Sequence, residues 1–297
     1  DFKEMIEKEN LDVVDIATPN DFHSVIAVYA LEHGCHVFCE KPDAVSVEEA
    51  LKMKAASEKS GKVLMIMRNN RYYGHSVFAK NYIESGKMGE IYCGRCGWIR
   101  RRGIPGRGGW FTTKAKSGGG PLIDLGVHMI DLAIWLMGNP TPVAVSGATY
   151  RKFADNEAQS DSVHAKFGSK QENGTFDVED LAMGMIRFDN GAVLQLEFSW
   201  ASNIDHETRF VELRGTKSGL TWEGDCGVKF FSEEQGQLTD LVPHCQAGDG
   251  HVANMRHFVD VVVNHVKPDF EPIQGINMIK ILQALYKSAD TGKEVQL

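Results

Sequence analysis

The first part of the chain alternates short apolar runs with segments whose apolar residues recur at helical spacing. This alternation predicts strands and helices in turn, an order typical of a parallel, doubly wound sheet. The predicted elements are helix 1–9, strand 11–17, helix 22–31, strand 36–39, helix 47–60 and strand 62–67. Ligands of such sheets lie beyond the carboxyl ends of the strands, where Pro19-Asn20 and Glu40-Lys41-Pro42 stand in this sequence.

After Arg68 the pattern changes to long strands. Asp189-Asn190-Gly191 is typical of a hairpin turn between two of them, which indicates an antiparallel sheet. The predicted helices are at about 75–85, from the end of the loop at Gly120 to Met137, at 252–265 and at 276–289. The predicted strands are around Cys93 and at 181–188, 192–200, 210–214, 219–222 and 228–231. The sequence therefore predicts an α/β protein. Residues 1–68 form an incomplete Rossmann-type parallel sheet domain, and residues 69–297 form an α+β domain with a large, mainly antiparallel sheet.

Charge and cysteine content narrow the choice of partners. The 297 residues carry a formal net charge of −8, which repels nucleic-acid phosphates, so we expect no nucleic acid as a partner. Apolar runs such as 132–137 are far shorter than the roughly 20 residues of a membrane span, so we expect no membrane contact. Six scattered cysteines indicate reduced thiols and a cytoplasmic protein. A small molecule is the predicted partner.

Cys93 and Cys96 have the spacing of a redox pair or of half a zinc site. They fall within a predicted strand, where residues three apart point to opposite faces, and no second pair with this spacing follows. We therefore expect neither a metal site nor a redox function from them.

Three groups of residues resemble successive signatures of the Gfo/Idh/MocA family. They are Ala17-Thr18-Pro19-Asn20 with His23, Gly34-x-His36-Val37-x-Cys39-Glu40-Lys41-Pro42, and Gly118-Gly119-Gly120-x-x-x-Asp124-x-Gly126-x-His128-x-x-Asp131. The C-terminal segment 288–293 also resembles the closing segment of that family. The resemblance covers the chain in the right order. It implies an oxidoreductase that transfers a hydride between NAD or NADP and a hydroxyl or carbonyl carbon of a sugar, cyclitol or related polyol.

The phosphate-binding loop of such a family is not found ahead of these motifs. The loop has the pattern G-x-G-x-x-G and is followed by an acidic residue about twenty positions later, and together they grip the pyrophosphate and ribose. The resemblance places both before Asp1. We therefore expect the sequence to represent the greater part of such an oxidoreductase without the front of its nucleotide-binding domain.

The chemistry of hydride transfer singles out three residues. An alcohol that gives up a hydride also loses a proton, which requires a positioned base. His128 has an ordinary pKa of about 6.5, and Asp124 lies four residues earlier on the same helical face. Lys41 lies where Pro42 ends a strand, so its ammonium can point into the crevice. We predict that His128 is the general acid/base and that Asp124 orients substrate or imidazole, and the resemblance assigns Lys41 to the reacting oxygen.

Each of these three residues also has a simpler interpretation. Lys41 alone would be a solvated surface lysine, and His128 alone would be a core histidine bound to a carbonyl. Asp124 alone would be an acid at the start of a helix. The catalytic hypothesis requires the three side chains to converge across a single cleft.

The resemblance also implies which residues bind cofactor and substrate. The predicted cofactor contacts are Thr18, Pro19, Asn20, His23, Glu40, Lys41 and Asn69, although turn chemistry alone would explain Pro and Asn there and His23 could instead cap the following helix. The predicted substrate contacts are Arg71, Tyr72, Trp110, Asp124 and His128. The basic loop of Arg100, Arg101, Arg102 and Arg107 would select an acidic sugar or, in the simpler interpretation, is a solvated loop.

Two other functions remain open at this point. One is a glycosidase of the same fold that uses bound NAD transiently, and net turnover of added cofactor separates it from a dehydrogenase. The other is a non-catalytic regulator that binds a dinucleotide, which the presence of Lys41, Asp124 and His128 disfavours. For each of these functions, as for the dehydrogenase, we expect a homo-oligomer, a dimer or tetramer, formed through the antiparallel sheet.

Overall fold

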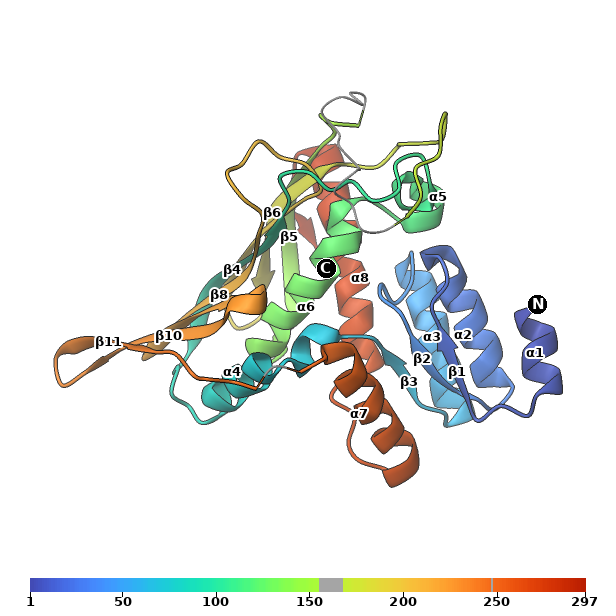
Figure 1. Cartoon of the computed structure of the whole chain (residues 1–297), viewed down its shortest axis with the longest axis horizontal. Helices are drawn as coiled ribbons and strands as arrows, with labels where there is room; N and C mark the ends of the chain where they lie inside the picture. Colours follow the sequence, from blue (N-terminus) through green and yellow to red (C-terminus); the bar gives the residue numbers. More distant parts are fainter. Residues whose placement is uncertain (155–167, 247) are drawn as a thin grey trace.

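A small parallel sheet forms one end of the molecule, and a large sheet forms the other (Figure 1). The computed structural model describes residues 1–154, 168–246 and 248–297. The small sheet has the order β1-β2-β3, and both pairs of strands are parallel. Its elements are α1 (Phe2–Lys8), β1 (Val13–Ile16), α2 (His23–Glu32), β2 (His36–Cys39), α3 (Val47–Ser60) and β3 (Leu64–Ile66). The predicted order of strands and helices in this part is confirmed.

Local sequence explains the ends of α3. The Ser46 hydroxyl accepts a hydrogen bond from the Glu49 N–H at 3.2 Å, which satisfies one of the free donors of the first turn. Gly61 ends the helix in the left-handed region with a φ of 67°, a conformation that costs glycine little. The helix therefore begins and ends where the sequence predicts.

The large sheet has nine strands in the order β11-β10-β9-β8-β4-β7-β6-β5-β12. Neighbouring strands are antiparallel except β4 and β7, which pair in parallel. The strands are β4 (Ile91–Ile99), β5 (Pro142–Tyr150), β6 (Leu181–Phe188), β7 (Val193–Ser199), β8 (Thr208–Gly215), β9 (Ser218–Glu223), β10 (Gly227–Glu234), β11 (Gln237–Leu241) and β12 (Val295–Gln296). The prediction of a mainly antiparallel sheet is confirmed, but the sequence pattern did not predict β5, β11 and β12.

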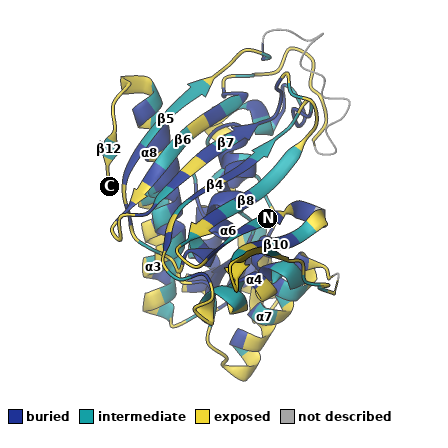
Figure 2. Cartoon of the chain, turned by 90° about the vertical axis from the view of Figure 1, so that its left-hand side faces the viewer, coloured by how far each residue is buried: buried dark blue, intermediate teal, exposed yellow. Residues whose placement is uncertain are grey.

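Helices cover one face of the large sheet, with α6 and α8 lying along it (Figure 1). The opposite face, turned toward the viewer in Figure 2, mixes buried side chains with half-buried and exposed ones. The helices of this part are α4 (Gly74–Glu84), α5 (Lys114–Ser117), α6 (Val127–Leu136), α7 (Gly250–Asn264) and α8 (Pro272–Thr291). The two last helices also return to the small sheet, because α7 packs against β2 and α8 packs against α3 and β3.

One long apolar stretch belongs to the core between the sheets. By length and composition, residues 114–136 could cross a membrane, a property that the short apolar runs of the sequence did not suggest. In the fold, 83% of the most apolar window of this stretch is buried inside the protein. Its hydrophobic residues, among them Leu132 and Leu136, are core residues that pack under the large sheet.

Candidate active site

Lys41 and Asp124 form an ion pair between the two sheets. Lys41 follows β2, and its peptide bond to Pro42 is cis. Its Nζ donates to Asp124 Oδ1 at 3.1 Å and to the Asp124 carbonyl oxygen at 3.0 Å. The side chains are 17% and 16% exposed, so a ligand can reach both. The structure therefore brings together two of the three residues predicted to perform the chemistry.

Asp124 is held in its ionised form. The indole N–H of Trp200 donates to its second carboxylate oxygen, Oδ2, at 3.0 Å. Burial on its own would raise the pKa of Asp124, but the charges of Lys41 and Arg100 and the hydrogen bonds from Trp200 and Lys41 outweigh burial and hold the pKa below its usual value. The carboxylate is consequently a fixed acceptor at neutral pH.

A π-helical turn carries Asp124 into the site. The turn spans Leu122–Gly126 and leads directly into α6, where the sequence predicted uniform helix. Single turns of π-helix are rare and occur often at functional sites, because they change the direction of one side chain without ending the helix. Asp124 lies in this turn, and His128 is the second residue of α6.

The Gly118–Gly120 run lets the chain turn tightly before Asp124. A Cβ at Gly119 would lie 2.0 Å from the Tyr286 hydroxyl, and one at Gly120 would lie 2.1 Å from the Glu179 carbonyl oxygen. The buried Glu179 carboxylate accepts the N–H groups of Gly120 and Leu122 and the Tyr286 hydroxyl. The glycines are therefore required by close packing, and Glu179 anchors the start of the π-helical turn.

His128 is partly buried beside Trp98, with ring centroids 6.1 Å apart. Burial lowers its pKa well below the usual value of 6.5, and electrostatic interactions with Lys41, Arg68, Arg209 and His251 lower it further. The imidazole is therefore neutral at neutral pH and has a lone pair that can accept a proton.

A cavity of about 190 Å³ lies at the carboxyl ends of β1 and β2. It is lined by Ala17, Thr18, Asn20, Glu40, Lys41, Trp110, Phe111, Ser117, Gly119, Ile123 and Asp124. Six of these were predicted as site residues: Thr18, Asn20, Glu40, Lys41, Trp110 and Asp124. The Asn20 amide donates to the Ser117 carbonyl at 2.7 Å, which ties the β1 loop to α5 across the cavity.

Among the buried polar atoms without a partner, one follows β1 and lines the cavity, and another follows β3. They are Thr18 Oγ1 and Asn69 Oδ1, and in the described part of the chain neither makes a hydrogen bond. A buried polar group without a partner is costly and points to a missing ligand. The hydroxyl, the amide oxygen and the Glu40 carboxylate suit the hydroxyl and amide groups of a nicotinamide nucleotide, so these residues fit that cofactor.

The other six predicted residues do not line this cavity: Pro19, His23, Asn69, Arg71, Tyr72 and His128. His23 is fully buried, with Nδ1 at 2.8 Å from the Pro42 carbonyl oxygen and Nε2 at 3.0 Å from that of Thr18, so it neither reaches the cavity nor caps α2. Pro19 precedes the turn Asn20–Phe22 and does not line the cavity. Tyr72 donates its hydroxyl to Asp269 Oδ1 at 2.6 Å. His23 thus joins the loops that follow β1 and β2.

Arg71 is a correction to the predicted substrate wall. Its guanidinium is 2% exposed and donates to both carboxylate oxygens of Asp131, at 2.6 and 2.8 Å. The turn Asn69–Tyr72 directs this side chain inward, where the Asp269 carbonyl and Gln274 complete its hydrogen bonds. A guanidinium buried in this way is not available to a substrate.

The basic loop is neither free nor simply solvated. Arg101 and Arg102 donate to the carbonyl oxygens of Asp205 and Ser202, and Arg107 donates to that of Ala154. Arg100 lies 5.0 Å from the centroid of the Trp98 ring. These arginines therefore fasten the loop to neighbouring segments.

The Cys93 and Cys96 pair lies inside β4, as predicted. Cys96 is buried and Cys93 is half-buried, and burial raises the pKa of the Cys96 thiol, which keeps it protonated. Within residues 1–154, 168–246 and 248–297, no three His, Cys, Asp or Glu side chains gather as metal ligands would.

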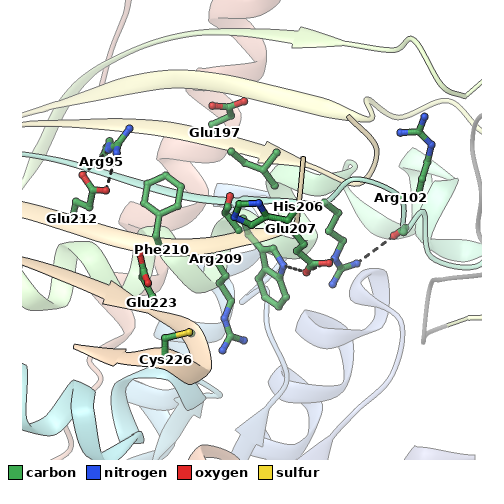
Figure 3. A pocket seen from close by; sticks show the side chains of 16 residues that line it. Arg95, Arg102, Glu197, His206, Glu207, Arg209, Phe210, Glu212, Glu223 and Cys226 are labelled. Atoms are coloured by element: carbon green, nitrogen blue, oxygen red, sulfur yellow. Dashed lines mark hydrogen bonds and ion pairs between the residues drawn. The ribbon is translucent and has the colours of Figure 1, made fainter. Parts of the chain in front are cut away.

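A larger cavity of about 920 Å³ lies along β4 and β8 (Figure 3). Its walls carry ion pairs such as Arg95 with Glu212, and the Trp98 indole donates to Glu207 at 2.7 Å. Lys41, Asp124 and His128 do not line it. We assign the chemistry to the smaller cavity because that one contains the lysine and the carboxylate.

Besides the unpredicted residues of the cavity wall, sequence reasoning missed three residues that hold the site in place. Trp200 binds Asp124, Trp98 contacts His128, and Glu179 anchors the π-helical turn. Trp200 and Glu179 lie far from Asp124 in the sequence and come close to it only in the fold. No local spacing in the sequence therefore reveals them. The sequence offers only weak signals for them: an acidic residue two positions before a strand and an indole directly after one.

Comparisons with known proteins show the family to which the chain is similar. The family profile described as "Oxidoreductase family, NAD-binding Rossmann fold" matches residues 1–67, and that described as "GFO/IDH/MocA C-terminal domain" matches residues 77–221. D-glucoside 3-dehydrogenase of Escherichia coli (strain K12) is 35% identical over 288 residues, covering 96% of this chain and 79% of that protein. Levoglucosan dehydrogenase of Pseudarthrobacter phenanthrenivorans is 33% identical over 227 residues, covering 75% of this chain but only 58% of that protein.

Solved structures share the fold over the full chain. The structure of levoglucosan dehydrogenase in complex with NADH and levoglucosan has a TM-score of 0.86 at 25% identity. The match covers 100% of this chain and 82% of the other. The small parallel sheet and the large mixed sheet therefore have the arrangement of a known group of oxidoreductases.

Proposed function

Because the chain belongs to the GFO/IDH/MocA family of NAD-binding oxidoreductases, we propose that it oxidises a ring hydroxyl of a sugar or cyclitol or reduces the matching ketone. The relatives named D-glucoside 3-dehydrogenase and levoglucosan dehydrogenase support a substrate with a pyranose ring. NAD is the cofactor that the family description names, and NADP stays an alternative.

One observation carries this proposal: the Lys41 ammonium, from the loop after β2, and the Asp124 carboxylate, from the turn before α6, meet 3.1 Å apart at the cavity. His128 follows Asp124 by four residues, at the start of α6. An ammonium has three N–H donors, and Lys41 uses two of them on Asp124. The third is left for a substrate oxygen. Lys41 then stabilises negative charge that develops on this oxygen, as a preorganised donor does.

The proton steps are assigned to His128. In the direction of oxidation, the neutral imidazole accepts the hydroxyl proton while Lys41 holds the oxygen. In the direction of reduction, the protonated imidazole returns it. Asp124 stays ionised and keeps Lys41 in place, so it orients the donor and does not itself transfer the proton.

The nicotinamide ring, when bound, supplies the chemistry of accepting or giving the hydride. Thr18, Asn20, Glu40 and Asn69 would hold its ribose and amide end, since their polar atoms surround the carboxyl ends of β1 to β3. Trp110 and Phe111, stacked at 3.8 Å, offer a flat apolar wall to the other side of the cavity.

The open face of the large sheet supports a proposal of self-association, to a dimer or tetramer. Along β4, β6 and β10 this face carries Tyr92, Met183 and Phe231, which are between 40% and 49% exposed. Exposed apolar side chains on a broad sheet are typical of subunit interfaces. Neither nucleic acid nor membrane is part of the proposed function.

The function is tested by adding NAD⁺ or NADP⁺ and a panel of pyranosides and cyclitols to the full-length protein and following the absorbance of reduced nicotinamide. We expect turnover with at least one pyranoside and a loss of about 100-fold or more in Lys41→Ala and His128→Ala. Near-normal turnover in either variant would refute the assigned roles. Release of an aglycone without net cofactor reduction would identify a glycosidase instead.

A further inference from the structure

Four buried charged side chains lie between the loop that carries Lys41 and the helix that carries His128. They are Asp43, Arg68, Arg71 and Asp131, and each is at most 5% exposed. Two positive and two negative charges compensate one another, which is the condition under which charges persist in a protein interior. This cluster lies outside the cavity and has no role in the mechanism described above.

Arg68 is the member that reaches both catalytic elements. Its Nη2 donates to Asp43, which lies two residues after Lys41 in the loop after β2. Its Nε donates to Asp131 Oδ1 at 3.0 Å, and Asp131 lies three residues after His128 in α6. One planar guanidinium thus spans the small sheet and the helix under the large sheet.

The surroundings of Arg68 prevent it from shifting. Its backbone N–H donates to Asn254 Oδ1 of α7 at 2.6 Å, and the Phe270 ring lies 5.1 Å from the guanidinium carbon. A Cβ at Gly275 of α8 would lie 1.7 Å from Asp43 Oδ1, so Asp43 also has no free space on that side. The bridge therefore has one geometry.

We propose that Arg68 is a positioning residue, whose guanidinium fixes the Lys41 ammonium relative to the His128 imidazole by holding Asp43 and Asp131. This inference rests on the proposed function, since it concerns the geometry of the same site. A displacement of about 1 Å of a reacting group can cost 100-fold in rate, so a rigid link between the two elements has a direct catalytic effect.

The charge of Arg68 has a second consequence at the same site. The titratable groups that act on the His128 pKa are Lys41 from the loop after β2, Arg68 from the segment after β3, Arg209 from β8 and His251 from α7, and the Asp124 carboxylate lies one turn before it. Arg68 therefore helps to keep the imidazole neutral. A variant that keeps the position but not the charge, or the charge but not the geometry, separates the two effects.

Three variants of the full-length protein test the proposal. Asp43→Asn keeps size and the charge of Arg68 but weakens the link to the Lys41 loop. Arg68→Lys keeps a charge but cannot span both carboxylates, and Arg68→Gln loses both. Ser288→Ala is the control, because it removes a buried hydrogen bond of 2.9 Å from the Gly147 N–H, between α8 and β5, which contain neither Lys41 nor His128.

The expected results differ for each variant. Asp43→Asn and Arg68→Lys should lower kcat about 10-fold or more with little change in substrate KM, while the acid limb of the pH profile stays in place. Arg68→Gln should lower kcat and also move this limb to higher pH. Ser288→Ala should retain kcat. Circular dichroism and thermal melts establish that each variant is folded at the assay temperature.

Two readouts decide the inference even without turnover. The His128 imidazole, followed by NMR in histidine-labelled protein, should titrate at higher pH in Arg68→Gln than in the wild type or Arg68→Lys. A crystal structure of Asp43→Asn should show the contact of 3.1 Å between Lys41 and Asp124 lost or lengthened. Unchanged kcat and an unchanged contact in Asp43→Asn would overturn the proposal. A wild type that oxidises no sugar would instead refute the proposed function, while these two measurements still report on Arg68.

Discussion

Replacing Trp200 by Phe removes a single N–H from the Asp124 carboxylate and keeps an aromatic ring in the core. The indole is fully buried, and its N–H reaches Asp124 Oδ2 at 3.0 Å. Hydrogen bonds to charged groups contribute about 1.5–3 kcal/mol to stability, against about 0.5–1.5 kcal/mol for neutral pairs. Trp200→Phe should therefore lose the stability of a charged hydrogen bond in addition to the loss from the smaller ring.

Trp222 provides a matched control. It is also fully buried, but its N–H donates to a neutral acceptor, the Ser76 hydroxyl, at 2.8 Å. Trp222→Phe removes the same atoms, so the difference between the two variants isolates the charged acceptor. We expect Trp200→Phe to be less stable than Trp222→Phe by about 1–1.5 kcal/mol at pH 7, measured by urea unfolding.

The pH dependence gives the sign of this difference. The pKa of Asp124 is lowered in the folded protein, so its stabilising contribution is complete above the unfolded value of 3.8 and is lost as the pH falls through the folded value. The difference between the variants should thus be equal at pH 7 and pH 5 and shrink only below about 3.8. Turnover should fall about 10-fold in Trp200→Phe but not in Trp222→Phe, because only Trp200 donates a hydrogen bond to Asp124. Equal losses of stability in both variants at pH 7 would refute the reasoning.

Two further predictions follow from the same site. Because the folded pKa of His128 lies well below 6.5, the unfolded chain binds an extra proton below this pH, so wild-type stability should fall by about 1 kcal/mol between pH 7.5 and 5.5. His128→Asn should lose less over this interval in urea unfolding, and an equal loss would contradict a neutral imidazole. Gly119→Ala should cost about 1–3 kcal/mol in thermal or urea unfolding, since its Cβ would lie 2.0 Å from the Tyr286 hydroxyl. The same substitution in a Tyr286→Phe background should cost less, and an unchanged cost would show that this contact is not the cause.

Much of the small sheet could be predicted from the sequence because its signals are local. The helix 47–60 and the strand 36–39 have the observed ends, since Ser46, Gly61 and the flanking turns act over a few residues. The hairpin of β6 and β7 was equally readable from Asp189-Asn190-Gly191. The parallel pairing of β4 with β7 was not, because it joins strands about a hundred residues apart.

The candidate site divides in the same way. Lys41, Asp124 and His128 were predicted from motifs and expected chemistry, and the structure shows the contact between the first two. The inward direction of Arg71 could not be foreseen, because it depends on Asp131, sixty residues away, and on the 3₁₀ turn that aims the side chain. The π-helical turn was missed for a related reason: an extra residue in one helical turn leaves no mark in an apolar pattern that is buried on all sides.

The position of α8 limits how the cleft can open. The helix packs on β5 of the large sheet and on α3 and β3 of the small one, while α7 contacts β2. The polypeptide thus passes between the two halves more than once. A hinge rotation about residue 68 alone would break the packing of these helices against one of the sheets. We therefore expect any further opening of the cleft to come from small sliding movements of α8 against α3, of the kind that packed helices permit without losing contact.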